Sequence, residues 1–517
     1  MQNALEKLDS PEIFIGLVSP VGVETSGVIS SISRFFISSG YDVFDIKVTD
    51  YFDILKKSLY IDLPLTKKPI DRRIFSYIDF GNKIREEFND DSVLAAHAVF
   101  RIAKIREREF KKKQQISYQK RVYIIHQFKR KEEIDLMRSV YGRLFFQISI
   151  YSSKKSRIDY LSHRIAHDRG TADQSESRSI AHDLVARDEN EKKNLHGQRL
   201  TKIFHDADFI VNCDAVEHDG ADKQVTRFLE LIFSSNSISP TKLEYGMFAA
   251  KAAALRTLDL SRQVGAAIFR SSGEVISLGS NEVPKAGGGT YWCDEAPYDA
   301  REYTIGFDSN DGRKREILAE IFAAAESPLS FDEFAKKEAV RESQFMDALE
   351  YGRIVHAEMS AISDAARLGL SVADATLFCT TFPCHMCAKH IVSAGLKKVV
   401  FLEPYPKSLA GDLHSDSIQI EGASRGRYET YEAVKFEHFH GVTPRRYREL
   451  FERGSRKSDG QFEPYIRDRK RPNLSLIAPF YTDFEAKVVR SGFAAFEEIV
   501  VRKAAASENQ KKFNAPR

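Results

Sequence analysis

The sequence predicts an α/β protein with two main domains, each built on a largely parallel sheet. Its 517 residues exceed what one hydrophobic core normally holds. In both halves, short apolar runs typical of buried strands alternate with longer segments of helical periodicity. This alternation favours parallel sheets with helices on both faces. We place the domains at residues 1–235 and 240–453, the second with an insertion at about 285–345. A C-terminal extension, 454–517, ends in a polar tail that we expect to be disordered.

The first domain begins with a buried strand at 13–18, a loop of small residues at 19–25 and a helix at 26–38. Strand, small-residue loop and helix is the layout of a phosphate-binding P-loop. We therefore take Gly16, Gly22 and Thr25 as candidates for nucleotide contacts. Further strands of the same sheet are predicted at 43–48, 122–125, 144–150 and 208–211.

The loop departs from the P-loop pattern G-x-x-x-x-G-K-[ST]. With Thr25 aligned to its last position, Glu24 replaces the lysine and Val23 replaces the second glycine. A carboxylate at the lysine position would repel the β- and γ-phosphates. We expect a degenerate, kinase-like P-loop domain that binds a nucleotide or none, and no phosphoryl transfer.

The second domain carries His-Ala-Glu at 356–358 and Pro-Cys-His-Met-Cys at 383–387. One imidazole, from His356, and two thiolates, from Cys384 and Cys387, would fill three corners of a tetrahedral Zn²⁺ and leave the fourth for water, as in catalytic sites. Glu358 would be the catalytic general base that takes the proton of that water and passes it to the ring nitrogen and the leaving ammonia. The combination of H-x-E with P-C-x-x-C marks zinc nucleobase deaminases.

The predicted elements place these residues at helix N-termini. A helix is expected at 357–368, a strand at 372–381, a helix from Pro383 to about 394 and a strand at 398–402. The helix dipole would help hold the two cysteines as thiolates. The alternative is a closed structural site, with Cys379 or His385 as fourth ligand, but Glu358 would then have no purpose.

Residues upstream extend the pattern to a hairpin, with a strand at 261–268, a turn, and a return strand at 275–278 that ends at Asn281. The hairpin and the two helices resemble the cytidine deaminase-like α/β/α fold, and most closely deoxycytidylate deaminases. The resemblance implies that Asn281 contacts the sugar, that Ser261 and Gln263 lie near the substrate phosphate, and that the amide of Ala357 holds the pyrimidine edge. An ordinary turn residue is the alternative for Asn281.

Tyr405 follows the predicted strand 398–402, on the side where such sites open. We expect its ring to pack on the nucleoside. A surface turn is an equal alternative for Tyr405 and for the neighbouring Lys407, which would otherwise meet phosphate.

The whole layout resembles the bacterial anti-phage dCTP deaminases. This resemblance implies conversion of dCTP and dCMP to their uracil counterparts, which depletes dCTP during phage infection. It also implies a resting enzyme held inactive by a regulator, in some systems an inhibitory small RNA, with the N-terminal domain as the candidate sensor. The resemblance to deoxycytidylate deaminases, which commonly form dimers or hexamers, implies a homo-oligomer.

Composition bears on the remaining alternatives. A net charge of +3 provides no basic field for nucleic acid, which counts against a cytosine or adenine editing deaminase. A non-catalytic zinc-containing sensor stays open. The five cysteines and the lack of an apolar signal segment predict a reducing, cytoplasmic location. The sequence has no run of about 20 apolar residues, so we expect no membrane span.

Overall fold

The computed structural model describes residues 8–113, 117–189, 191, 194–214, 220–295, 297–325, 327–454, 456–463, 472, 474 and 478–513. The chain divides into two compact units. The first is formed by Met1–Ser239 with His440–Arg517, and the second by Pro240–Phe439. Residues 440–453, which we had expected in the second domain, thus group with the first unit.

The first unit is built on a six-stranded sheet in the order β12-β5-β4-β1-β3-β2. Five strands run parallel, and only β12 is antiparallel, to its neighbour β5. Because β12 comes from the chain after the second unit, this sheet is completed by residues remote in sequence. The strands are β1 (Ile13–Val18), β2 (Asp42–Lys47), β3 (Arg121–His126), β4 (Phe145–Tyr151), β5 (Phe209–Asn212) and β12 (Gly441–Val442).

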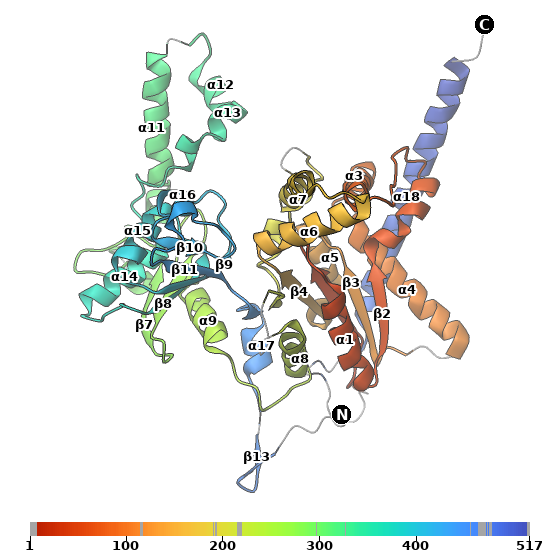
Figure 1. The fold of residues 1–517 in the computed structure, drawn as a ribbon, viewed down its shortest axis with the longest axis horizontal. Coiled ribbons are helices and arrows are strands. Elements are labelled where there is room, and N and C mark those ends of the chain that lie inside the picture. Colours follow the sequence, from red (N-terminus) through yellow and green to blue (C-terminus); the bar gives the residue numbers. More distant parts are fainter. Residues whose placement is uncertain are drawn as a thin grey trace. The chain divides into compact units, whose positions relative to one another are not determined.

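Helices cover both faces of this sheet (Figure 1). On one side, α1 (Ser26–Ser38) packs against α8 (Ala221–Ile232); on the other, α4 (Val93–Lys113) packs against α5 (Lys131–Tyr141) and α18 (Tyr481–Phe513). The unit also contains α2 (Phe52–Ser58), α3 (Ile70–Phe88), α6 (Lys154–Arg169), α7 (Gln174–Glu189), α17 (Tyr447–Phe451) and the short hairpin of β13 (Lys457–Ser458) and β14 (Gln461–Phe462).

The C-terminal extension differs from the disordered tail that we expected. Helix α18 continues to Phe513, so most of the polar segment 507–517 is helical, and residues 514–517 lie outside the described part. Its helical part, 507–513, contains Glu508, Gln510, Lys511 and Lys512, which are good helix formers, so a polar composition alone did not distinguish a helix from a tail.

The second unit has a six-stranded mixed sheet in the order β10-β11-β9-β8-β6-β7. The hairpin β6–β7 and the pair β6–β8 are antiparallel, whereas β8, β9, β11 and β10 run parallel. The strands are β6 (Gly265–Phe269), β7 (Val275–Ser280), β8 (Thr376–Thr381), β9 (Lys398–Glu403), β10 (Ile418–Ile420) and β11 (Val434–His438).

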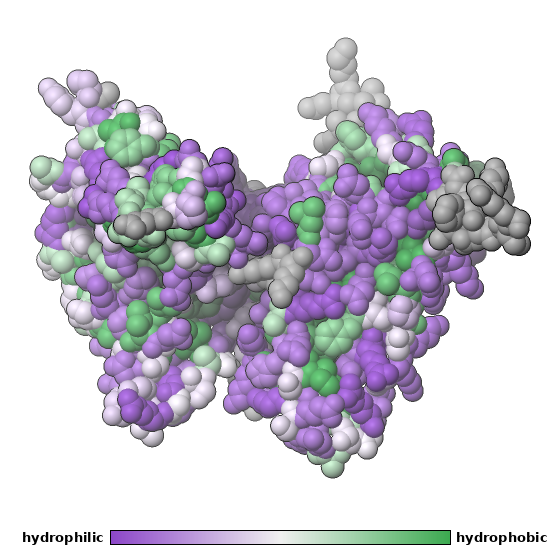
Figure 2. Space-filling model, turned by 90° about the horizontal axis from the view of Figure 1, so that it is seen from above, coloured by the Kyte–Doolittle hydropathy of each residue, from purple (hydrophilic) through white to green (hydrophobic). Residues whose placement is uncertain are grey.

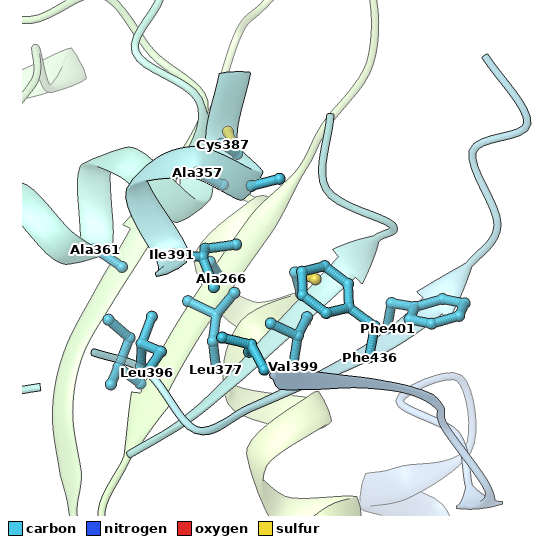
Figure 3. Packing of buried hydrophobic residues seen from close by; sticks show 14 of the residues in the cluster. Ala266, Ala357, Ala361, Leu377, Cys387, Ile391, Leu396, Val399, Phe401 and Phe436 are labelled. Carbon is cyan, nitrogen blue, oxygen red and sulfur yellow. The ribbon is translucent and has the colours of Figure 1, made fainter. Parts of the chain in front are cut away.

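The sheet lies between two helical layers. Successive side chains of a strand point to opposite faces, so each strand packs against both layers. Leu377 and Cys379 of β8 join the core under α14 (Ala357–Arg367) and α15 (His385–Ser393). Between them, Phe378 faces α9 (Lys242–Ala254), where a Cβ on Gly246 would come within 2.4 Å of its ring. Figure 3 shows the first of these cores, with Ala357 and Cys387 close together at one end.

The region between β7 and α14 is the expected insertion. It forms α10 (Glu302–Ile305), α11 (Ser309–Ala324), α12 (Phe331–Lys336) and α13 (Glu338–Arg341), of which α11 is conspicuous in Figure 1. A short helix, α16 (Ala410–Leu413), follows β9 and contacts α15.

On the face shown in Figure 2, hydrophilic residues cover most of the surface, and hydrophobic residues are scattered among them in small groups. None of the described helices combines the length and the apolar character needed to cross a lipid bilayer.

Candidate active site

His356 and Glu358 are positioned by the start of α14. His356 is the N-cap of this helix and Glu358 lies in its first turn. The segment before His356 is fixed by two backbone hydrogen bonds between Glu282 and Val355, of 3.2 and 3.1 Å. The end of the β6–β7 hairpin therefore holds the residue that precedes the histidine.

Cys384 and Cys387 are positioned by the start of α15. Cys384 is the N-cap, and its sulfur accepts a hydrogen bond from the backbone N–H of Cys387 at 3.5 Å. Both side chains are buried. Because the N-terminus of a helix carries a partial positive charge, both sulfurs lie where thiolates are stabilised.

The three side chains converge on one point. His356 Nδ1 lies 3.2 Å from Cys384 Sγ and 3.4 Å from Cys387 Sγ. The ligand atoms of a tetrahedral zinc with usual bond lengths are about 3.6 Å apart, so this donor set fits the ion after only small shifts. Within the described part of the chain, these residues form the one group of three or more His, Cys, Asp or Glu able to hold a metal.

The two residues considered as a fourth ligand lie outside this group. Cys379 is fully buried and its thiol donates to the carbonyl oxygen of Val400 at 3.7 Å. His385 Nε2 lies 3.4 Å from Glu350 Oε1. The described residues thus provide three ligands and leave one coordination position without a protein donor, as in catalytic zinc sites.

Glu358 lies beside the three ligands and is 4% exposed. Its Oε2 is 3.3 Å from Cys387 Sγ. Burial, and then the negative charge of Cys384, raise the pKa of Glu358 above its usual value. The hydrogen bond from Cys387, and then the neighbouring His356, lower the pKa of Cys384. A carboxylate with an increased proton affinity, close to the metal ligands, is suited to accept and return a proton.

A cavity of about 390 Å³ opens beside the three ligands. Of the substrate-contact residues predicted from the sequence, Ser261, Asn281, Ala357 and Tyr405 line this cavity. Gln263 does not; it is exposed, and its Nε2 donates to the carbonyl oxygen of Thr257 at 3.1 Å. The structure thus brings four of these five residues to one cavity with His356, Glu358 and Cys384.

The amide of Asn281 organises the loop that forms one wall. Its Oδ1 accepts from the N–H of Val264 at 2.7 Å, and its Nδ2 donates to the carbonyl oxygen of Arg262 at 2.8 Å and to the carboxylate of Asp259. Asp259 in turn accepts from the N–H of Ser261 at 2.7 Å. Asn281 is therefore more than a turn residue, since its side chain ties the loop to the end of β7.

Several residues of the cavity wall were not among those predicted from the sequence. Asp259 lines it, and burial raises the pKa of this carboxyl group. Its one local signal is the Asp-x-Ser spacing, which is typical of a turn closed by a side chain. From the insertion, Met346, Asp347 and Leu349 also line the cavity, and Asp347 forms an ion pair with Lys407. No local pattern indicates that these residues would reach the site.

In the first unit, the three nucleotide-contact candidates have different surroundings. Gly16 lies within β1, where a Cβ would come within 2.5 Å of the ring of Phe145, so its small size serves packing. Gly22, with a φ of +92°, and Thr25, the N-cap of α1, line a second cavity. Gly16 is not among the residues that line that cavity.

The second unit also has relatives among known proteins. The sequence model of the family described as "Cytidine and deoxycytidylate deaminase zinc-binding region" matches residues 240–403. The deoxycytidylate deaminase of Enterobacteria phage T4 is 37% identical over 153 residues, which are 29% of this chain and 72% of that protein. The chain belongs to the cytidine and deoxycytidylate deaminase family.

Two further matches to this deaminase region have lower sequence identity. A probable deoxycytidylate deaminase of Drosophila melanogaster is 28% identical over 161 residues, 31% of this chain and 58% of that protein. Among solved structures, the dCMP deaminase of the cyanophage S-TIM5 in complex with dCMP and dUMP is 19% identical, with a TM-score of 0.22, and covers 38% of this chain and 98% of that one. The match to the family's zinc-binding region, 240–403, spans His356, Glu358, Cys384 and Cys387. Together with the group of three metal-binding side chains, this match confirms the prediction of zinc as cofactor.

Proposed function

We propose that the protein hydrolytically deaminates deoxycytidine nucleotides, converting dCMP and dCTP to dUMP and dUTP with release of ammonia. The observation that carries this proposal is the position of Glu358, a buried carboxyl group that supplies no metal ligand but lies 3.3 Å from one, at the wall of an open cavity. Membership of the deaminase family supports the same reaction class.

The reaction requires one proton carrier and a fixed pyrimidine. Zinc held by His356, Cys384 and Cys387 would supply the Lewis acidity that makes a water molecule a nucleophile at neutral pH. Glu358 accepts a proton from the attacking water and delivers it to N3 of the cytosine. As the bond between C4 and the amino nitrogen breaks, Glu358 transfers the second proton to the departing ammonia, and the oxygen of water remains on C4 as the carbonyl of uracil.

The other lining residues would hold the substrate. The amide of Ala357, in the first turn of α14, faces the pyrimidine edge, and Tyr405 packs on the nucleoside. The loop tied down by Asn281 carries Ser261 and Arg262, which lie near the sugar and phosphate. Gln263 lies on the same loop outside the cavity wall, so its contact with phosphate would require the loop to move.

We further propose a biological role in depleting dCTP during phage infection. The support is the resemblance of the whole layout, a kinase-like first unit joined to a deoxycytidylate deaminase unit, to bacterial anti-phage dCTP deaminases. On this proposal the protein is a homo-oligomer under control of an inhibitory small RNA or another regulator. Glu358→Gln should then abolish protection of cells against phage, and full protection by this variant would contradict the role.

The deciding experiment is chromatographic analysis of dCMP, dCTP, CTP, cytidine and a cytosine-containing oligonucleotide after incubation with zinc-loaded protein. Glu358→Gln should lower turnover of the deoxynucleotides by about 100-fold or more while zinc stays bound, since it removes the general base. Glu432→Gln, an exposed residue of the same unit, is the matched control and should retain full activity.

The same assay separates the alternatives. Conversion of the oligonucleotide alone would assign the protein to the nucleic-acid editing deaminases. An unchanged rate for Glu358→Gln would contradict the mechanism. No conversion of any substrate by the zinc-loaded wild type, freed of bound nucleic acid, would favour a non-catalytic zinc sensor.

A further inference from the structure

A second cavity, of about 290 Å³, lies in the first unit at the carboxyl ends of its parallel strands. Residues that follow β1, β2 and β3 line it, together with residues from α3 and α6, which lie at one end of the sheet in Figure 1. In the sheet order, β1 lies at the centre, with β3 and β2 on one side and β4 and β5 on the other, so the direction of strand addition reverses at β1. The carboxyl ends at such a switch point are where open α/β sheets bind ligands.

The lining of this cavity has charge of one sign. Among the described residues that line it, none is Asp or Glu. Five Lys and Arg side chains contribute to it, from four different parts of the unit: Lys47, Arg73, Arg85, Lys129 and Arg164. Several cations around one cavity repel one another, which is unfavourable unless an anion binds among them.

Two of the five cations already have carboxylate partners. Arg85 forms an ion pair with the buried Glu133 at 2.9 Å. Lys129 Nζ donates to Asp188 Oδ1 at 2.7 Å and to the carbonyl oxygen of Ser19 at 2.8 Å. These pairs hold the cavity walls together, and the positive charges of Arg85 and Lys129 are largely neutralised by their carboxylate partners.

The other three, Lys47, Arg73 and Arg164, form no ion pair with any carboxylate of the described residues. The guanidinium of Arg73 lies over the ring of Tyr77, 5.1 Å from its centroid. Arg164 Nη1 donates to the hydroxyl of Tyr160 at 2.9 Å. Both arginines are thus positioned by aromatic neighbours and have no ion-pair partner among the described residues, an arrangement that favours a bound anion.

The loop after β1 is not the main anion site. The N–H of Val21 donates to Asp188 Oδ2 at 2.6 Å, and Asp188 is fully buried. A protein carboxylate therefore occupies a loop amide that would otherwise be available to a phosphate. Any anion in this cavity would be held by the three side chains from β2, α3 and α6.

The positive surface continues into a neighbouring cavity of about 530 Å³, which shares Arg73, Tyr160 and Arg164. It adds Lys67, Lys68, His163 and His167. Asp168, the one acidic residue among the described residues of its lining, accepts a hydrogen bond from the N–H of Ile70 at 2.6 Å. A ligand with several negative charges could extend from one cavity to the other.

We propose that these two cavities form a binding site for a nucleoside polyphosphate, separate from the deaminase site. Lys47, Arg73 and Arg164 bind the phosphates, and Tyr77 and Tyr160 provide aromatic surface for the base. These contacts differ from the set predicted from the sequence: Gly16 is enclosed in the sheet, and the loop amide of Val21 is already hydrogen-bonded, whereas Gly22 and Thr25 line the cavity. It does not depend on the proposed deamination.

Calorimetric titration of the full-length protein with ATP and with inorganic triphosphate tests the site. Neither probe is a cytosine compound, and variants of Arg73 and Arg164 distinguish this site from any phosphate binding in the deaminase cavity. Arg73→Gln and Arg164→Gln should each weaken binding by at least about 10-fold, since each removes a charge-assisted contact to phosphate. Arg72→Gln, one position from Arg73 on α3 but exposed and outside both linings, is the matched control and should bind like the wild type.

Circular dichroism spectra must first show that each variant is folded. Unchanged affinity of the folded double variant Arg73→Gln/Arg164→Gln would overturn the proposal. So would the failure of the wild type to bind either probe at millimolar concentration. Binding of an RNA oligonucleotide that requires Arg73 and Arg164, without binding of ATP or triphosphate, would assign the surface to RNA instead. Glu358→Gln should bind both probes normally, which separates this test from that of deamination.

Discussion

A Cβ atom on Gly279 of β7 would lie 2.1 Å from the carbonyl oxygen of Ala357, the first residue of α14. It would also come within 2.5 Å of the backbone nitrogen of Ala361, one turn further along. Both contacts are with main-chain atoms, which cannot move aside as a flexible side chain can. Glycine at this position therefore lets the helix lie directly on the strand. Since His356 caps this helix and Glu358 is in its first turn, the contact fixes the proposed metal ligand and the proposed proton carrier together.

Gly279→Ala should displace the start of α14. We expect a loss of stability of about 1 to 3 kcal/mol, the usual cost of overpacking, and a large loss of activity because His356 and Glu358 move relative to Cys384. Urea denaturation and zinc content, measured beside turnover, check this expectation. Gly27→Ala is the control, since its added Cβ has no neighbour within 4 Å. Wild-type stability and turnover of Gly279→Ala would show that the helix can shift without consequence.

The assignment of three metal ligands predicts different effects for the cysteines of this unit. Cys384→Ser and His356→Ala should lose bound zinc as well as activity, because each removes a donor. Cys379→Ser should keep zinc, because the Cys379 thiol points to the carbonyl of Val400. Elemental analysis of the purified proteins by mass spectrometry gives the metal content directly. One equivalent of zinc in Cys384→Ser, or none in a folded Cys379→Ser, would contradict the assignment.

Local signals account for what the sequence could predict. The apolar run at 13–18 is strand β1, and the segment at 26–38 is helix α1. The residues that could hold zinc come from two short motifs, each at the start of a helix, so their chemistry was readable without knowing the tertiary structure. Helix α15 begins at His385, directly after its N-cap Cys384.

Contacts between distant segments had no such signal. Gly441 and Val442 pair with β5 of the first unit, but two residues carry no pattern that would indicate a strand or its partner. Asp347 of the insertion reaches the cavity and pairs with Lys407, which depends on how the insertion folds back. The role of Asn281 in tying down the loop at 259–264 likewise depends on tertiary contacts.

The contact between α18 and the sheet of the first unit is another such long-range feature, and its stability contribution can be measured. Arg106 lies between Glu12 and Glu485, with N···O distances of 2.7 Å to each, and all three side chains are buried. Glu485→Ala would leave part of the Arg106 charge without compensation. We expect a loss of about 3 kcal/mol in the free energy of unfolding, the lower end for breaking a buried ion pair, because Glu12 remains.

Urea denaturation measures this loss, and limited proteolysis shows whether α18 is released. Glu497→Ala, an exposed residue of the same helix, is the control and should be neutral. Equal stability of Glu485→Ala and the wild type would mean that the pair of Arg106 and Glu485 makes no net contribution to stability.

The buried side chain of His97 on α4 should make the free energy of unfolding depend on pH. Its ring lies near Tyr51, with 5.0 Å between centroids, and its Nε2 is buried with no hydrogen-bond partner among the described residues. Burial, and then the positive charge of Arg101, lower the pKa of His97 from 6.5 to about 4. The folded protein therefore keeps this ring neutral at a pH where the unfolded chain has already bound a proton.

Stability should consequently fall as the pH decreases from about 6.5 to about 4, with no contribution from His97 above that range. The full effect is about 3 kcal/mol, since each pKa unit corresponds to about 1.4 kcal/mol. His97→Gln cannot bind this proton, so the difference in stability between variant and wild type should shift in favour of the variant on acidification. Urea denaturation at pH 7.5, 6, 5 and 4.5 measures it, with the exposed His182→Gln as control. A difference that stays constant across this series would show that His97 is protonated in the folded protein as readily as in the unfolded chain.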